Sequence, residues 1–199
     1  MPLKEIRDVT SHTRLGLWRM DETAAEMLEL FPHLAALEMP FKNEGRQREF
    51  YSIRALLATM TGNKSLLIGH LPSGRPVVEG YNVSISHTRG YAALILSESE
   101  DVAVDIEQRG DRVARIARKF IRPDEEAATI EQMLTLWSAK EALYKLHSED
   151  NLEYFDMRLV SLSPSRLLIE NMKRGQLVDI RHELTSDYVL TYHPIETTI

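Results

Sequence analysis

The chain has 199 residues, with 24 Lys and Arg against 30 Asp and Glu, so its formal net charge is −6 when His is neutral. Hydrophobic residues make up 43% and charged residues 27%, which is typical of a globular protein and excludes a disordered one. The absence of cysteine excludes a disulfide framework, a thiolate zinc site and a cysteine nucleophile. The acidic balance also argues against nucleic acid as the main partner.

The hydropathy pattern predicts no membrane segment. The first eight residues are too polar for a signal peptide. The longest clearly apolar run, Tyr91–Leu96, is far shorter than the roughly 20 residues that a membrane span needs. We therefore expect a cytoplasmic protein.

The first half of the chain predicts strands and helices in alternation. Apolar spacing at Phe50, Ile53, Leu57 and Met60 is helical, and Gly62 is a suitable C-terminal stop. The turn at 98–101 predicts a hairpin between the strands on either side of it. The predicted elements are a strand at 14–20, helices at 21–30 and 44–60, and strands at 82–86, 91–97 and 102–107.

The second half predicts three helices followed by four strands. A basic helix is expected at 111–121, a second helix near 123–125, and a longer helix at 131–147. Strands are expected at 157–162, 167–170, 177–181 and 188–193. The fold class is therefore α+β, with a predicted boundary near 98–101 that separates a half at 1–98 from a half at 99–199.

The strand at 102–107 carries two acidic residues on one face. Because strand side chains alternate, Asp105 and Glu107 point the same way, about 6–7 Å apart. A hard divalent cation would relieve the repulsion between them. The alternative interpretation is the solvated face of an edge strand.

The helix at 131–147 carries a polar stripe at helical spacing. The stripe consists of Trp137, Lys140, Glu141, Tyr144 and Lys145, beside an apolar face that meets the core. Glu141 and Lys145 are spaced for a simple surface ion pair. They would equally complete a metal and phosphate site, in which Asp105, Glu107 and Glu141 hold Mg²⁺, with Mn²⁺ as the alternative.

Two further segments of the first half carry candidate phosphate ligands. His87 lies at a strand end between Ser86 and Thr88, where it can donate to a phosphate. Arg75 is placed on a constrained turn between Gly74 and Pro76. The alternatives are a structural histidine and a solvated arginine.

Taken together, these motifs resemble the 4′-phosphopantetheinyl transferase superfamily. That family carries Asp-x-Glu on a strand and Trp/Phe-Ser-x-Lys-Glu-Ala/Ser-x-x-Lys on a helix, matched here by 103–107 and 137–145. The upstream Ser86-His87-Thr88, the Gly-Arg-Pro turn and Arg54-Ala-Leu-Leu57 resemble its surfactin-type members, which join two similar halves in one chain. Ala103 replaces the usual glycine, and the interval from Asp105 to Lys140 is shorter than in many such relatives.

The resemblance implies a pseudo-two-fold α+β fold with the site between halves and a monomeric state. It implies Mg²⁺-dependent transfer of the 4′-phosphopantetheine arm of coenzyme A to a serine of an apo acyl or peptidyl carrier protein, releasing 3′,5′-ADP. Glu141 is the implied base, or only a metal ligand, and Lys145 stabilises the leaving phosphate. The implied coenzyme A ligands are Arg54, Arg75, Ser86, His87, Thr88, Lys140 and Lys145, with Arg46 as a further candidate.

The basic segment of the second half is a candidate docking site. Residues 109–122 contain six Arg or Lys and one Asp, a charge of 6 − 1 = +5 within an acidic chain. Carrier proteins in this family's reactions are typically acidic, so Arg112–Arg122 would attract one. The alternatives for this segment are a solvated helix face and RNA binding.

Two rival interpretations remain for the function of the whole chain. The first is a non-catalytic module that binds coenzyme A or a carrier protein. The second is another Mg²⁺–phosphate enzyme, and the lack of a Walker-type loop argues against this second interpretation.

Overall fold

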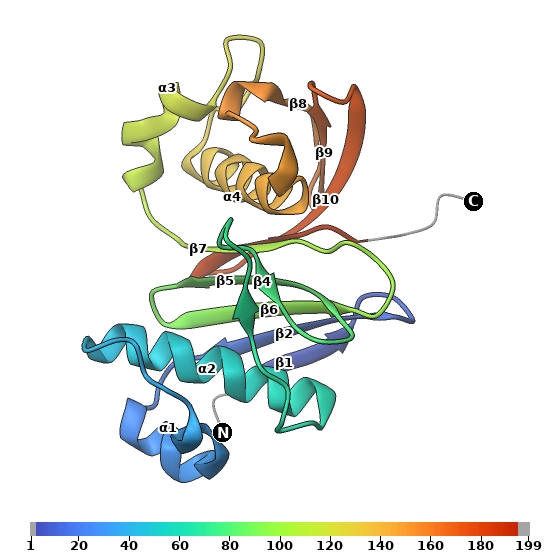
Figure 1. The fold of residues 1–199 in the computed structure, drawn as a ribbon. Helices are drawn as coiled ribbons and strands as arrows, with labels where there is room; N and C mark the ends of the chain where they lie inside the picture. Colours follow the sequence, from blue (N-terminus) through green and yellow to red (C-terminus); the bar gives the residue numbers. More distant parts are fainter. Residues whose placement is uncertain (1–2, 195–199) are drawn as a thin grey trace. The chain divides into compact units, whose positions relative to one another are not determined.

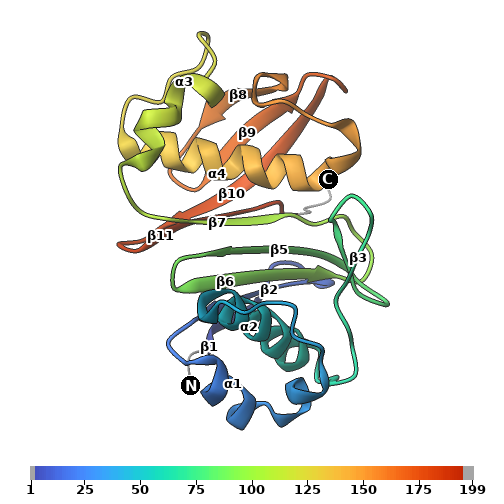
Figure 2. The same cartoon turned by 60° about the vertical axis from the view of Figure 1, so that its left-hand side comes forward.

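The computed structural model describes residues 3–194, and the chain divides into two compact units at Glu100 and Asp101. The predicted boundary, between residues 98 and 99, lies two residues before this division. Each unit has an antiparallel sheet and one long helix that packs on it (Figure 1, Figure 2). No helix among the described residues is long and apolar enough to span a membrane.

The sheet of the first unit has the strand order β1-β2-β6-β5, and every neighbouring pair is antiparallel. Three of these strands match predicted ones to within two residues. The edge strand β1 was not predicted, because only Leu3 and Ile6 of its largely charged sequence pack on the core. The strands are β1 (Leu3–Asp8), β2 (Thr13–Arg19), β5 (Asn82–Thr88) and β6 (Tyr91–Ser97).

The helices of the first unit begin and end at side chains that cap them. Helix α1 (Ala24–Leu30) starts three residues later than predicted, because Thr23 and Glu26 form a capping box. Pro32 then opens the 3₁₀ turn η1 (Pro32–Ala36). Helix α2 (Glu44–Thr61) begins after the cap Asn43 and ends at Gly62, whose φ of 69° suits glycine.

Helix α2 is the long helix of the first unit. It packs on β2 and β6, and its apolar face joins a core that includes Trp18 and Leu94. A short hairpin of β3 (Gly69–His70) and β4 (Pro76–Val77) follows the helix and precedes β5. Its connection turns at Gly74, which has a φ of 87°.

The sheet of the second unit has the strand order β7-β11-β10-β9-β8 and is also antiparallel. The four C-terminal strands were predicted to within three residues at each end. The strands are β7 (Val104–Gln108), β8 (Met157–Leu162), β9 (Arg166–Asn171), β10 (Gln176–Leu184) and β11 (Tyr188–Tyr192).

The predicted hairpin across residues 98–101 was wrong. Strand β6 pairs with β2 and β5, whereas β7 pairs with β11 in the other sheet. A turn signal shows that the chain can reverse, but it does not select which strand supplies the hydrogen-bonding edge.

Helix α4 (Ile130–Leu146) is the long helix of the second unit, and it begins at a capping box formed by Thr129 and Gln132. The predicted basic helix at 111–121 is instead the 3₁₀ turn η2 (Arg112–Ile116) followed by a single turn, α3 (Ala117–Phe120). Two further 3₁₀ turns, η3 (Ser148–Asp150) and η4 (Tyr154–Asp156), follow α4.

The helix predicted near 123–125 does not form. Glu125 is committed to distant partners: its carboxylate accepts the backbone N–H groups of Arg122 and Leu159 and pairs with Lys140. These contacts hold residues 121–128 as a loop against α4 and β8, so tertiary contacts override the local helix signal.

The two units share a chain path through their sheets. In each unit, the strand before the long helix pairs with the last strand of the unit. The last strand also pairs, on its other side, with the strand that comes just before it in the sequence. In the first unit these are β2, β6 and β5; in the second they are β7, β11 and β10. This mixed α/β arrangement is compatible with the predicted fold class, while the pseudo-two-fold relation stays a prediction.

Candidate functional site

The acidic face of β7 points at α4. Ala103 is part of the core beneath that helix, and Asp105 and Glu107 follow it at alternate positions. The predicted alternation of this strand is therefore confirmed. Asp105 is only 4% exposed, so its charge is largely removed from water.

Asp105 is held by two side chains of α4. Lys145 donates from Nζ to Oδ1 at 2.8 Å and also to the Val104 carbonyl at 3.0 Å. Ser138 donates from Oγ to Oδ2 at 2.9 Å and lies 2.9 Å from the Thr191 hydroxyl. The motif residues Ser138 and Lys145 thus converge on the first acid of the strand motif.

The other two acids each accept one aromatic donor. The indole Nε1 of Trp137 donates to Oε1 of Glu107 at 2.8 Å. The hydroxyl of Tyr154 donates to Oε1 of Glu141 at 2.7 Å. The Oε2 atoms of both glutamates accept no hydrogen bond from any residue in the range 3–194.

The electrostatics show that the three acids influence one another. Burial raises the pKa of Glu107, as do the charges of Asp105 and Glu141. Burial also raises the pKa of Glu141, and Asp105 adds to this, while the Tyr154 hydrogen bond and Lys145 oppose it. The charge of Lys145 opposes these shifts at both glutamates, and a bound divalent cation would lower the pKa of both further.

The chemistry of this donor set fits a divalent metal ion. Carboxylate oxygens are the ligands that Mg²⁺ prefers. Among residues 3–194, however, no group of three or more His, Cys, Asp or Glu side chains is already arranged to hold a metal. The metal-binding triad of Asp105, Glu107 and Glu141 therefore stays a prediction. In the structure, Glu107 and Glu141 each accept a hydrogen bond on one carboxylate oxygen.

Lys140 does not take the predicted place of a phosphate ligand. Its side chain and that of Glu125 are both 0% exposed, and they form an ion pair at 2.8 Å. The ammonium also donates to the carbonyls of Phe120 at 2.7 Å and Tyr154 at 3.3 Å. Because all three donors have protein acceptors and no water reaches them, Lys140 is a structural residue of this unit.

An aromatic cluster links these two groups of polar contacts. Trp137 and Tyr154 have ring centroids 5.0 Å apart, and Phe120 meets the Trp137 ring edge-on at 5.1 Å. The sequence analysis did not find Tyr154, which lies in the short turn η4 outside every motif. A pocket of about 460 Å³ adjoins Glu141 here, lined in part by Lys119, Tyr144 and Phe155.

Three predicted coenzyme A ligands of the first unit line one pocket. Arg46 and Arg54 reach it from α2, and His87 reaches it from β5. The pocket has a volume of about 350 Å³. Its remaining lining is largely apolar and aromatic, with one further histidine, His70, that the sequence analysis did not single out.

Cations in this pocket lie over aromatic rings. The Arg54 guanidinium lies 3.4 Å from the centroid of Phe50, and that of Arg46 lies 5.6 Å from Phe41. Burial lowers the pKa of Arg54 to about 10, which still leaves it charged at neutral pH. The Glu49 carboxylate lies 2.7 Å from the Arg46 guanidinium and 3.6 Å from Nε2 of His87.

The other predicted ligands of this unit do not line the pocket. Alternation along β5 directs Ser86 and Thr88 to the side opposite His87. Arg75 lies in the turn between β3 and β4, where its carbonyl accepts the N–H of Leu71. The roles of Arg75, Ser86 and Thr88 stay predictions.

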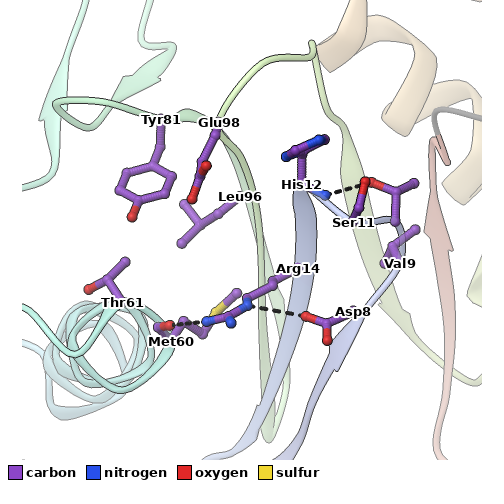
Figure 3. Close-up of a pocket in the computed structure, with 11 residues that line it drawn as sticks. Asp8, Val9, Ser11, His12, Arg14, Met60, Thr61, Tyr81, Leu96 and Glu98 are labelled. Atoms are coloured by element: carbon purple, nitrogen blue, oxygen red, sulfur yellow. Dashed lines mark hydrogen bonds and ion pairs between the residues drawn. The ribbon is translucent and has the colours of Figure 1, made fainter.

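A second pocket of the first unit, of about 600 Å³, contains no predicted site residue (Figure 3). Arg14 crosses it, donating to Asp8 at 3.2 Å and to the Met60 carbonyl at the end of α2 at 2.8 Å. These contacts give Arg14 a structural role in closing the helix end.

The basic segment divides into paired and unpaired cations. Arg109 pairs with Glu131, and Arg122 pairs with Asp124 at 2.8 Å. Val113 and Phe120, on the apolar side of this segment, are buried. Four exposed cations between them have no ion pair or hydrogen bond among the described residues: Arg112, Arg115, Arg118 and Lys119.

Comparison with known proteins bears on the second unit. Residues 101–193 match the family model ACPS, described as the 4′-phosphopantetheinyl transferase superfamily. No curated protein matches the chain significantly. The matched range runs from before β7 to after β11 and holds Asp105, Glu107, Glu141 and Lys145. This match supports a transferase and supports placing the C-terminal unit, with its acidic cluster, in the 4′-phosphopantetheinyl transferase superfamily.

Proposed function

We propose that this chain is a surfactin-type, Mg²⁺-dependent transferase that moves 4′-phosphopantetheine from coenzyme A to a serine of an apo acyl or peptidyl carrier protein. The observation that carries the proposal is the cluster of Asp105, Glu107, Glu141 and Lys145 on β7 and α4, inside the range matched to the superfamily.

The reaction exchanges one phosphorus–oxygen bond for another. The serine Oγ attacks the phosphorus that carries the pantetheine arm, and the bond from that phosphorus to the oxygen bridging to the second phosphate breaks. The products are a serine phosphodiester and 3′,5′-ADP. The serine proton must leave as the new bond forms, and negative charge grows on the departing phosphate.

The residues of the cluster suit these requirements. Asp105, Glu107 and Glu141 would hold Mg²⁺, which would neutralise charge on the diphosphate when bound. Lys145, whose ammonium lies against Asp105, would neutralise charge on the leaving group. Glu141 would accept the serine proton, a role that its raised pKa favours, or it would serve as a metal ligand only.

The pocket of the first unit is the candidate site for the nucleotide. Its two arginines and His87 can donate to phosphate, and its aromatic rings offer flat apolar surface to a base. Phosphate oxygens would replace Glu49 as the partner of His87 and Arg46. The four unpaired cations at 112–119 would attract an acidic carrier protein.

The proposal is tested by incubating the full chain with coenzyme A, Mg²⁺ and an apo carrier protein and measuring the carrier's mass. The expected result is a mass gain of one phosphopantetheine group on serine. Asp105→Ala should abolish it, and Glu126→Ala, which removes an exposed acid outside the cluster, should not. No mass gain, with coenzyme A still bound, would instead support a non-catalytic binding module.

A further inference from the structure

Tyr154 reaches the acidic cluster from outside both sequence motifs. Its hydroxyl donates to Oε1 of Glu141 at 2.7 Å, although the two residues belong to different elements, η4 and α4. A carboxylate can rotate about its terminal bond at little cost, so a fixed donor on one oxygen determines where the other oxygen lies.

The phenol is itself held from two sides. Its ring packs on Trp137, with centroids 5.0 Å apart, and its backbone carbonyl accepts the ammonium of Lys140 at 3.3 Å. Lys140 is anchored in turn by its buried ion pair with Glu125. The backbone of Tyr154 is therefore linked through Lys140 to a buried ion pair, and its ring is held by Trp137.

Glu107 is held in the same manner by the neighbouring ring. Trp137 Nε1 donates to Oε1 of Glu107 at 2.8 Å, and Oε2 of each glutamate accepts nothing from residues 3–194. The two packed aromatic side chains thus each donate a hydrogen bond to one carboxylate oxygen. The second oxygen of each glutamate is left available to bind a cation. Lys145 cannot supply this control, because its ammonium is directed at Asp105 and the Val104 carbonyl.

We infer that Tyr154 is a positioning residue whose hydroxyl holds Glu141 in the orientation in which its second oxygen binds a divalent cation, as Trp137 does for Glu107. The inference rests on the metal site of the proposed function. It goes beyond that proposal by assigning a role to a residue of η4, through a contact that neither motif contains.

The inference is tested with Tyr154→Phe, which removes the hydroxyl and keeps the ring. Binding of Mn²⁺ to the full chain is followed by electron paramagnetic resonance, with and without coenzyme A. Loss of an outer hydrogen-bond partner of a metal ligand typically weakens binding by about 10-fold or more, and we expect that loss here. Tyr144→Phe is the matched control, because its exposed hydroxyl has no partner among the described residues, and it should leave Mn²⁺ affinity unchanged.

A double-mutant cycle separates positioning from a structural effect. If Tyr154 acts through Glu141, adding Tyr154→Phe to Glu141→Ala weakens Mn²⁺ binding no further. An additive loss in the double variant, or an unchanged affinity in Tyr154→Phe alone, would overturn the inference. The thermal unfolding midpoint of metal-free Tyr154→Phe should stay within a few degrees of the unaltered chain.

These outcomes are independent of the transfer reaction. If the unaltered chain binds Mn²⁺ but does not modify a carrier protein, the proposed activity fails while the cycle still decides the role of Tyr154. If the unaltered chain binds no Mn²⁺ under either condition, the role assigned to Tyr154 is wrong, whatever the carrier's mass shows.

Discussion

At the scale of single residues, the acidic cluster places charges where folding alone would not favour them. Asp105 is buried, and burial raises the pKa of both Glu107 and Glu141. Removing carboxylates from water costs free energy unless they are paired, and the ion pair of Lys145 is made with Asp105, not with Glu107 or Glu141. Unfavourable charge clusters of this kind are typical of functional sites.

His87 allows the nucleotide pocket to be tested by itself. If its ring donates to the 3′-phosphate, His87→Ala should weaken coenzyme A binding by roughly tenfold or more, because a hydrogen bond to a charged group is lost. Dephospho-coenzyme A lacks that phosphate and should lose little affinity. Calorimetry with both ligands measures the difference.

The control for this experiment is His12→Ala, which changes an exposed histidine that does not line the pocket. It should leave both affinities unchanged. Equal losses for the two ligands in His87→Ala would assign His87 to general pocket structure and would reject its role at the 3′-phosphate.

At the scale of elements, the loop after α3 is ordered by one buried ion pair. Lys140 and Glu125 form an ion pair, and each also makes hydrogen bonds with backbone groups, those of Phe120, Tyr154 and Leu159. These contacts take the place of the water that would otherwise solvate the two charges. Removing one partner of such a pair typically costs about 3–5 kcal/mol, because the other charge stays buried. The loop at 121–128 therefore stays against α4 without helical hydrogen bonds of its own.

The segment of η2 and α3 allows a test of the proposed docking of a carrier protein. Its apolar side chains face the core and its four unpaired cations face outward, so a partner can meet them. Arg115→Glu combined with Arg118→Glu should raise the KM for an acidic carrier protein by roughly tenfold, since like charges would oppose encounter. The KM for coenzyme A should not change.

Steady-state kinetics at two salt concentrations check this prediction. Raising the salt concentration should increase the KM of the unaltered chain for the carrier protein, because exposed charges are screened. The difference in this KM between the unaltered chain and the double variant should therefore become smaller. Lys64→Glu, an exposed substitution in the other unit, is the control. An unchanged carrier KM in the double variant would count against docking at this segment.

At the scale of the whole molecule, the pH dependence of stability includes a contribution from His147. This side chain is 8% exposed, and its Nδ1 lies 2.9 Å from the Asn171 amide nitrogen, which donates to a neutral ring. Burial lowers the pKa of His147, and the charge of Arg174 lowers it further. The unfolded chain therefore takes up this proton near pH 6.5, before the folded chain does.

The free energy of unfolding should consequently lose a contribution as the pH falls through about 6.5 toward the lower pKa of the folded state. His147→Gln removes the titrating group and should reduce the difference in unfolding free energy between pH 7.5 and 5.5. Urea denaturation of both proteins at the two pH values measures this change. An identical pH dependence in the variant would show that His147 does not titrate differently on folding.

The sequence by itself determined the elements whose signals are local. Helices α2 and α4 have apolar periodicity and side-chain caps, and the strands after residue 156 have alternating or β-branched segments between turns, so each was predicted to within a few residues. The shared face of Asp105 and Glu107 was predictable for the same reason, since alternation is a property of any strand.

Only the tertiary structure decided which distant groups meet. It gave β7 a partner in β11 instead of β6, turned the predicted helix near 123 into a loop, and buried Lys140 against Glu125. It also brought Tyr154 to Glu141, and Arg46, Arg54 and His87 into one pocket. Periodicity and capping act over a few residues, whereas strand pairing and the burial of charge depend on segments far apart in the chain, whose contacts exist only once the fold has formed.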